Sequence, residues 1–142
     1  MELLCPWESP AFLIFSSNIP TLLYYSHFIA ILAALIFGFA LVGKVRDSSP
    51  ARWFLAVIVL FSAWAAIDVL LWASNRPDVV LFYWNTQILL EILLYASAFY
   101  FAYVFLAKKD LPLWGKLGIT ALMAPVIALV PTAYVLEGID IA

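Results

Sequence analysis

Three ionisable side chains stand inside long apolar stretches of this chain. Asp68 lies in the run "WAAIDVLLW", Glu91 lies in "ILLEILLY", and His27 follows "TLLYYS". A charged side chain at the centre of a bilayer costs at least ~2.5 kcal/mol on insertion scales, so such groups face protein or water and often mark a function. Carboxylates and imidazole can carry protons or hydrogen-bond a polar ligand. Their chemistry therefore depends on how neighbouring helices place them.

Helical spacing groups these residues with other polar side chains. Asp68 shares one face of a helix with Trp64 and Trp72, which lie four residues to either side. A second stripe with the same spacing follows later in the chain: Gln87, Glu91 and Tyr95. Two neighbouring antiparallel helices could turn both stripes towards a common interior. The candidate sensing cluster thus contains six residues: His27, Asp68, Asn85, Gln87, Glu91 and Tyr95.

The sequence leaves two interpretations of this cluster open. In the first, the side chains form interhelical hydrogen bonds that fix the register of the helices, as expected above all for Asn85 and Gln87. Arg76, two turns beyond Asp68, could also partly neutralise that acid. In the second, Asp68, His27 and Glu91 belong to an outward-facing pocket or a protonatable cluster that senses a small ligand or pH.

The composition predicts the elements that must carry this cluster. Hydrophobic residues make up 67% of the chain and charged residues 11%, against about half and a quarter in soluble domains. The apolar residues fall into runs long enough to cross ~30 Å of hydrocarbon as helices. We therefore expect an all-α, polytopic membrane helix bundle with four spans: about 20–42, 53–73, 80–107 and 117–136.

The segments outside the spans are short. Residues 1–18 are broken by Pro6 and Pro10 and are expected to form an external segment at the membrane interface, and residues 138–142 a short external tail. Pro125 and Pro131 are expected to kink the fourth span, because each removes a backbone donor.

The basic residues predict the orientation of the bundle. Six of the seven lie in the first and third links: Lys44, Arg46, Arg52, Lys108, Lys109 and Lys116. Short loops rich in Lys and Arg stay in the cytoplasm. The expected topology is multi-pass in the inner or plasma membrane, with both termini outside.

Several classes of function are disfavoured by what the chain contains. A net charge of −2 with no basic patch argues against nucleic-acid binding. The sequence contains no catalytic motif that would point to an enzyme. The lysines lie in or beside the links, so none can hold a buried Schiff base. His27 and Cys5 are the sole members of their types, too few for a metal centre or a haem pair. We expect no cofactor, and the lipid bilayer as the main partner.

The order of spans and aromatic residues resembles the start of the seven-span N-terminal sensor region of bacterial membrane histidine kinases. The resemblance is carried by "FSAWAAIDVLLWASNRPDVVLFYWNTQ", by "ILLEILLYASAFYFAYVFLAKKDLP" and by the proline-containing "APVIALVPT". It covers about residues 20–136, or four of seven spans. It implies a truncated or split sensor region whose kinase module lies outside this chain. His27, within the membrane, cannot be the phosphoacceptor.

These observations lead to one main hypothesis and two alternatives. The main hypothesis is a sensor or signal-transduction module of a two-component system, whose expected partner is a kinase or a second copy of the chain. One alternative is a small transporter or channel subunit in which Asp68 and Glu91 carry a proton or cation. The other is a structural membrane-assembly subunit in which the polar groups hold helices together.

Overall fold

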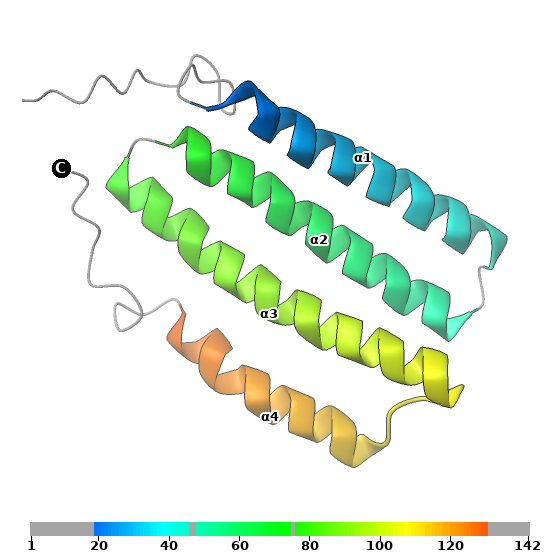
Figure 1. Cartoon of the computed structure of the whole chain (residues 1–142). Coiled ribbons are helices and arrows are strands. Elements are labelled where there is room, and N and C mark those ends of the chain that lie inside the picture. Colours follow the sequence, from blue (N-terminus) through cyan, green and yellow to red (C-terminus); the bar gives the residue numbers. More distant parts are fainter. Residues whose placement is uncertain (1–18, 46–47, 75, 131–142) are drawn as a thin grey trace, which may run out of the picture.

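The computed structural model describes residues 19–45, 48–74 and 76–130, which form a layer of antiparallel helices (Figure 1). Of these residues 89% are helical and none belongs to a strand, which confirms the all-α prediction. The helices are α1 (Thr21–Lys44), α2 (Ser49–Ala73), α3 (Pro77–Ala107) and α4 (Leu113–Leu129).

Three of these helices are long and apolar enough to cross a membrane. They are α1, α2 and α3, with 24, 25 and 31 residues. Helix α4 is also apolar but has 17 residues, a length of about 26 Å. The predicted membrane character is therefore confirmed, with three candidate spans and one shorter apolar helix.

The helices extend beyond the apolar runs that predicted them. Helix α1 continues to Lys44, α2 begins at Ser49 rather than near residue 53, and α3 begins at Pro77 rather than near residue 80. Proline in the first turn explains two of these early starts, since a first-turn N–H has no intrahelical partner and its loss costs little. Pro50 takes this place in α2, as Pro77 does in α3.

Pro125 lies inside α4, whereas Pro131, the external segment 1–18 and the tail 138–142 lie outside the described residues.

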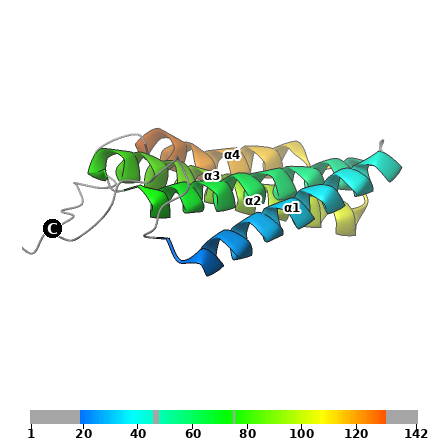
Figure 2. The same cartoon turned by 90° about the horizontal axis from the view of Figure 1, so that it is seen from above.

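The described helices form an open layer in which consecutive helices pack side by side. Among the described helices, α2 packs against α1 and α3, while α4 packs against α3 alone. The view from above shows the same arrangement, with α1 at one edge and α4 at the other (Figure 2). Apolar side chains such as Leu22, Leu106 and Leu122 are consequently 77–78% exposed within the chain. An apolar surface of this kind suits contact with lipid or with another protein.

Helix α2 forms the interior of the layer. Its buried positions are mostly small or β-branched: Ala51, Ile58, Ser62, Ala65, Val69 and Ala73. On the α1 side, Gly38 is buried, and a Cβ at this position would lie 2.7 Å from Cδ1 of Ile58. The absence of a side chain there lets the two backbones approach closely. Helix α2 is thus held on both sides, and Asp68 is held with it.

Candidate functional site

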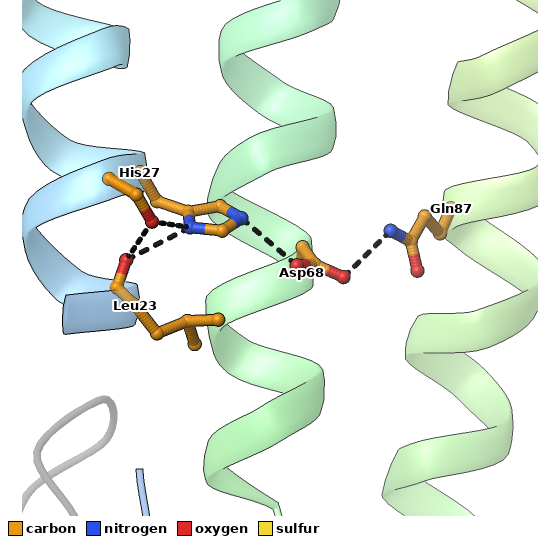
Figure 3. Close-up of polar contacts among 5 residues, drawn as sticks. Leu23, His27, Asp68 and Gln87 are labelled. Atoms are coloured by element: carbon orange, nitrogen blue, oxygen red, sulfur yellow. Dashed lines mark hydrogen bonds and ion pairs between the residues drawn. The ribbon is translucent and has the colours of Figure 1, made fainter. Parts of the chain in front are cut away.

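Asp68 accepts hydrogen bonds from both neighbouring helices (Figure 3). Nε2 of His27 on α1 lies 3.0 Å from one carboxylate oxygen, Oδ2. Nε2 of Gln87 on α3 donates to the other oxygen, Oδ1, over 3.1 Å. The side chains of His27 and Asp68 are each 19% exposed. One carboxylate therefore joins three helices, and we call this set of three residues the Asp68 chain.

The second nitrogen of the His27 ring constrains where its protons lie. Nδ1 is 2.9 Å from the carbonyl oxygen of Leu23 and 3.0 Å from Oγ of Ser26. A carbonyl can only accept, so the Leu23 contact requires a proton on Nδ1. When Nε2 also donates to an ionised Asp68, the ring carries both protons and the pair is an imidazolium–carboxylate ion pair. When Nδ1 has no proton, the Ser26 hydroxyl can donate to it instead.

A cleft lies beside Asp68 between α2 and α3. Its volume is about 390 Å³, within the ~300–1,000 Å³ range of small-molecule sites. Eight residues line it: Trp64, Asp68, Leu71, Trp72, Trp84, Gln87, Ile88 and Glu91. Three of the six residues in the predicted cluster thus share one cavity, while His27 reaches Asp68 from the α1 side.

Helical register arranges the lining of the cleft in three levels. Asp68 and Gln87 face one another at the middle level, as their hydrogen bond requires. Four residues before Asp68 is Trp64, and four residues after Gln87 is Glu91, so these two lie about 6 Å along the axes on one side. On the other side, near the α2–α3 turn, lie Trp72 and Trp84.

Two buried polar atoms beside this region have no hydrogen-bond partner among the described residues. They are Nε1 of Trp64 and Oδ1 of Asn85. Trp64 lines the cleft, whereas Asn85 does not. An unsatisfied buried donor costs free energy, and the Trp64 indole N–H is such a donor on a residue that lines the cleft.

Glu91 and Tyr95 form a separate pair on α3. The hydroxyl of Tyr95 donates to Oε1 of Glu91 over 2.9 Å. Tyr95 is 63% exposed and does not line the cleft. Gln87, Glu91 and Tyr95 thus follow one another along α3, but among them only Gln87 bonds to Asp68.

Arg76 does not neutralise Asp68, contrary to the expectation from spacing. Its guanidinium Nη2 instead donates to Oδ2 of Asp78 over 2.6 Å, and Nε donates to the other oxygen over 3.2 Å. Both side chains are more than 60% exposed. Arg76 lies before the first residue of α3, so a carboxylate in the first turn is nearer than one deep in α2.

A second polar group ties together the opposite end of the layer, where the basic links lie. Asp110 accepts from Nζ of Lys116 over 2.6 Å and also from the hydroxyl of Tyr100. The ring of Tyr100 packs on that of Trp53, with centroids 4.0 Å apart. The Lys116 ammonium, helped by Tyr100, lowers the pKa of Asp110 to about 2. These contacts connect α2, α3, the third link and α4.

The sequence interpretation missed Trp84 as a lining residue and the group around Asp110. Trp84 carried a usable signal, since it lies three residues before Gln87 and thus shares its helix face. No sequence signal pointed to Asp110, because its partners come from two helices and a link. Among the described residues, no three His, Cys, Asp or Glu side chains cluster as metal ligands would.

Comparisons of the chain with protein-family models, with curated proteins and with solved structures find no match. The case for a function therefore depends on the geometry of the Asp68 chain and of the cleft beside it.

Proposed function

We propose that this protein is a membrane-embedded sensor or signal-transduction module whose stimulus acts on the Asp68 chain. The observation that carries the proposal is the single carboxylate that bonds to α1 through His27 and to α3 through Gln87. A change at Asp68 alters the packing of both neighbours of α2 together. In this proposal α4 is a fourth span, and the basic links lie in the cytoplasm.

The His27–Asp68 pair supplies two states of different strength. With both ring protons present, an imidazolium faces a carboxylate, and the contact is charge-assisted. Loss of one proton leaves a neutral imidazole, whose Nδ1 can then turn from Leu23 to Ser26 as its partner. The contact between α1 and α2 weakens as a result. Glu91, across the cleft, is a second ionisable side chain beside Asp68.

Transmission requires that the two states differ in helix packing. Helices α1 and α3 run from the Asp68 chain to the basic links without a break in the helix. A tilt at one end therefore displaces the other end, where the Tyr100–Asp110–Lys116 contacts tie α3 to α4. Interhelical shifts of ~1–2 Å are sufficient in known switches.

The proposal is tested by measuring the distance between the ends of α1 and α3. Spin labels are placed at Val45→Cys and Leu106→Cys, both exposed positions, in a Cys5→Ser background. Electron paramagnetic resonance distances are then compared in nanodiscs. His27→Phe removes the hydrogen bonds of the ring but keeps its bulk, so we expect the distance to shift by ~1–2 Å or its distribution to broaden.

Tyr25→Phe is the matched control, because Tyr25 lies on α1 two residues away and is 61% exposed. It should leave the distance unchanged. If His27→Phe lowers thermal stability without changing the distance, the Asp68 chain serves assembly alone and the sensor proposal is wrong.

The recipient of the signal is proposed from the resemblance to histidine-kinase sensor regions and from no structural contact. Genomic sequence beyond the codon for Ala142 that encodes further spans and a kinase, or a kinase gene beside it, would support this part. A stop codon with no kinase gene nearby would contradict it.

One observation favours a transporter or channel subunit as the second candidate. Asp68 and Glu91, the two carboxylates that could carry a proton or cation, line the same cleft. This candidate predicts proton or cation flux into vesicles that falls when Glu91 becomes Gln. Equal flux with both side chains would eliminate it.

A further inference from the structure

We propose that the cleft between α2 and α3 binds a small organic ammonium compound that carries a hydroxyl or carbonyl oxygen. This inference deepens the proposed function, on which it rests, by naming the class of ligand. Its evidence comes from the eight lining residues, which combine two carboxylates and three indoles with no basic side chain.

The charges of the cleft call for a cation. Asp68 and Glu91 lie on facing helices about one helical turn apart along the axis. His27 contacts Asp68 from the α1 side and is not part of the lining. Glu91 accepts from the hydroxyl of Tyr95, a neutral donor. When the His27 ring is neutral, the two carboxylates repel one another, and a bound positive charge relieves that repulsion.

The indole rings indicate an organic cation. Trp72 and Trp84 stand at the level nearest the α2–α3 turn, where they are 51% and 44% exposed, and Trp64 stands at the deepest level. Tryptophan is the best aromatic partner for a cation, and sites that surround alkylammonium groups with aromatic rings are a recurrent solution. A volume of about 390 Å³ accommodates such a group together with a short chain.

The buried indole N–H of Trp64 is the reason to expect an acceptor oxygen on the ligand. It has no acceptor among the described residues, and it lies at the same level as Glu91. A ligand whose ammonium group sits between the carboxylates and the outer indoles can place a hydroxyl or carbonyl oxygen against this N–H. An inorganic cation would leave the indole N–H without an acceptor, and a neutral apolar molecule would leave the carboxylates uncompensated.

Choline and its neutral isostere 3,3-dimethyl-1-butanol provide a matched pair of probes, because they differ in one atom and one charge. Equilibrium dialysis with the full chain in nanodiscs measures both affinities. We expect choline to bind at least tenfold more tightly than the isostere. Equal affinities, or no saturable binding of choline below ~10 mM, would overturn the proposal.

Variants locate the binding. Glu91→Gln keeps the shape of the side chain and should weaken choline binding at least tenfold, as should Trp84→Leu. Asp110→Asn and Trp114→Leu are the controls, since they remove a carboxylate and an 82%-exposed indole outside the cleft. Circular dichroism verifies that each variant folds. A loss of affinity that is equal in the controls, or no loss in Glu91→Gln, would contradict a site in the cleft.

The distance measurement separates this inference from the proposed function. If choline binds as predicted but does not change the distance between the labelled ends of α1 and α3, the result supports the ligand site and contradicts the sensor function. If His27→Phe changes that distance while choline fails to bind, the ligand class is wrong and the sensor function stands.

Discussion

At the scale of the residue, Asp68 combines two roles that are usually separate. Its two oxygens receive one hydrogen bond each from α1 and α3, while its side chain also lines the cleft. A ligand cation beside the carboxylate competes electrostatically with a protonated His27 for the same negative charge. Occupancy of the cleft should therefore weaken the contact between His27 and Asp68.

Asp110 offers a residue whose titration can be predicted with its sign. Its pKa is lowered to about 2, chiefly by Lys116, from an ordinary value of ~3.9. The ionised Asp110 carboxylate stabilises the folded link. This stabilisation is fully present above ~pH 4 and is lost as the pH falls towards 2. Carbon-13 NMR of the labelled Asp110 carboxyl group should show a titration midpoint at a pH of about 2.

Lys116→Met should raise that midpoint towards ~3.9, because it removes the ammonium group that donates to Asp110. Lys109→Met, one residue from Asp110, provides the control and should leave the midpoint in place. A midpoint near 4 in the unaltered protein would show that the contact with Lys116 does not form.

At the scale of the element, sequence periodicity predicted the helices better than their rotation. The spacing of Asp68, Gln87 and Glu91 left open whether α2 and α3 turn these residues towards one another, and in the structure all three line the same cleft. The spacing could not predict that Tyr95 stays outside the cleft, since tertiary packing sets the rotation of each helix. The partner of Arg76 was also missed, because a local carboxylate at Asp78 competes with a distant one.

Gly38 tests the packing of α1 on α2. Gly38→Val places a side chain against Ile58 and should destabilise this contact by ~1–3 kcal/mol, the usual cost of overpacking. Gly43→Val is the matched control, since nothing lies within 4 Å of a Cβ at Gly43. Thermal unfolding in nanodiscs measures the difference. Equal effects of both substitutions would show that α1 and α2 are not in close contact at Gly38.

At the scale of the whole molecule, composition was sufficient to predict an apolar, all-helical membrane protein, but not its open shape. Whether helices close into a bundle depends on which faces meet, and the apolar surface of α1, α3 and α4 gives little preference among faces. The sequence therefore predicted the helical membrane character, and the order in which the helices pack is seen only in the structure. The exposed apolar surface of the layer remains free for lipid or for a second protein.

The proposed orientation can be tested with single cysteines in a Cys5→Ser background. Arg76→Cys lies in the second link and should react with a membrane-impermeant maleimide added to intact cells. Lys109→Cys, in the third link, should react only after the membrane is permeabilised, because basic links stay in the cytoplasm. The opposite pattern would invert the topology.

The order in which the helices contact one another also bears on how the protein is made. Each described helix packs against its neighbour in the sequence, so the contacts between helices join consecutive elements. Proteins of low contact order fold quickly and can assemble during synthesis, N-terminal part first. The three residues of the Asp68 chain all precede α4 in the sequence. The site can therefore form on a nascent chain whose helix α4 has not yet left the ribosome.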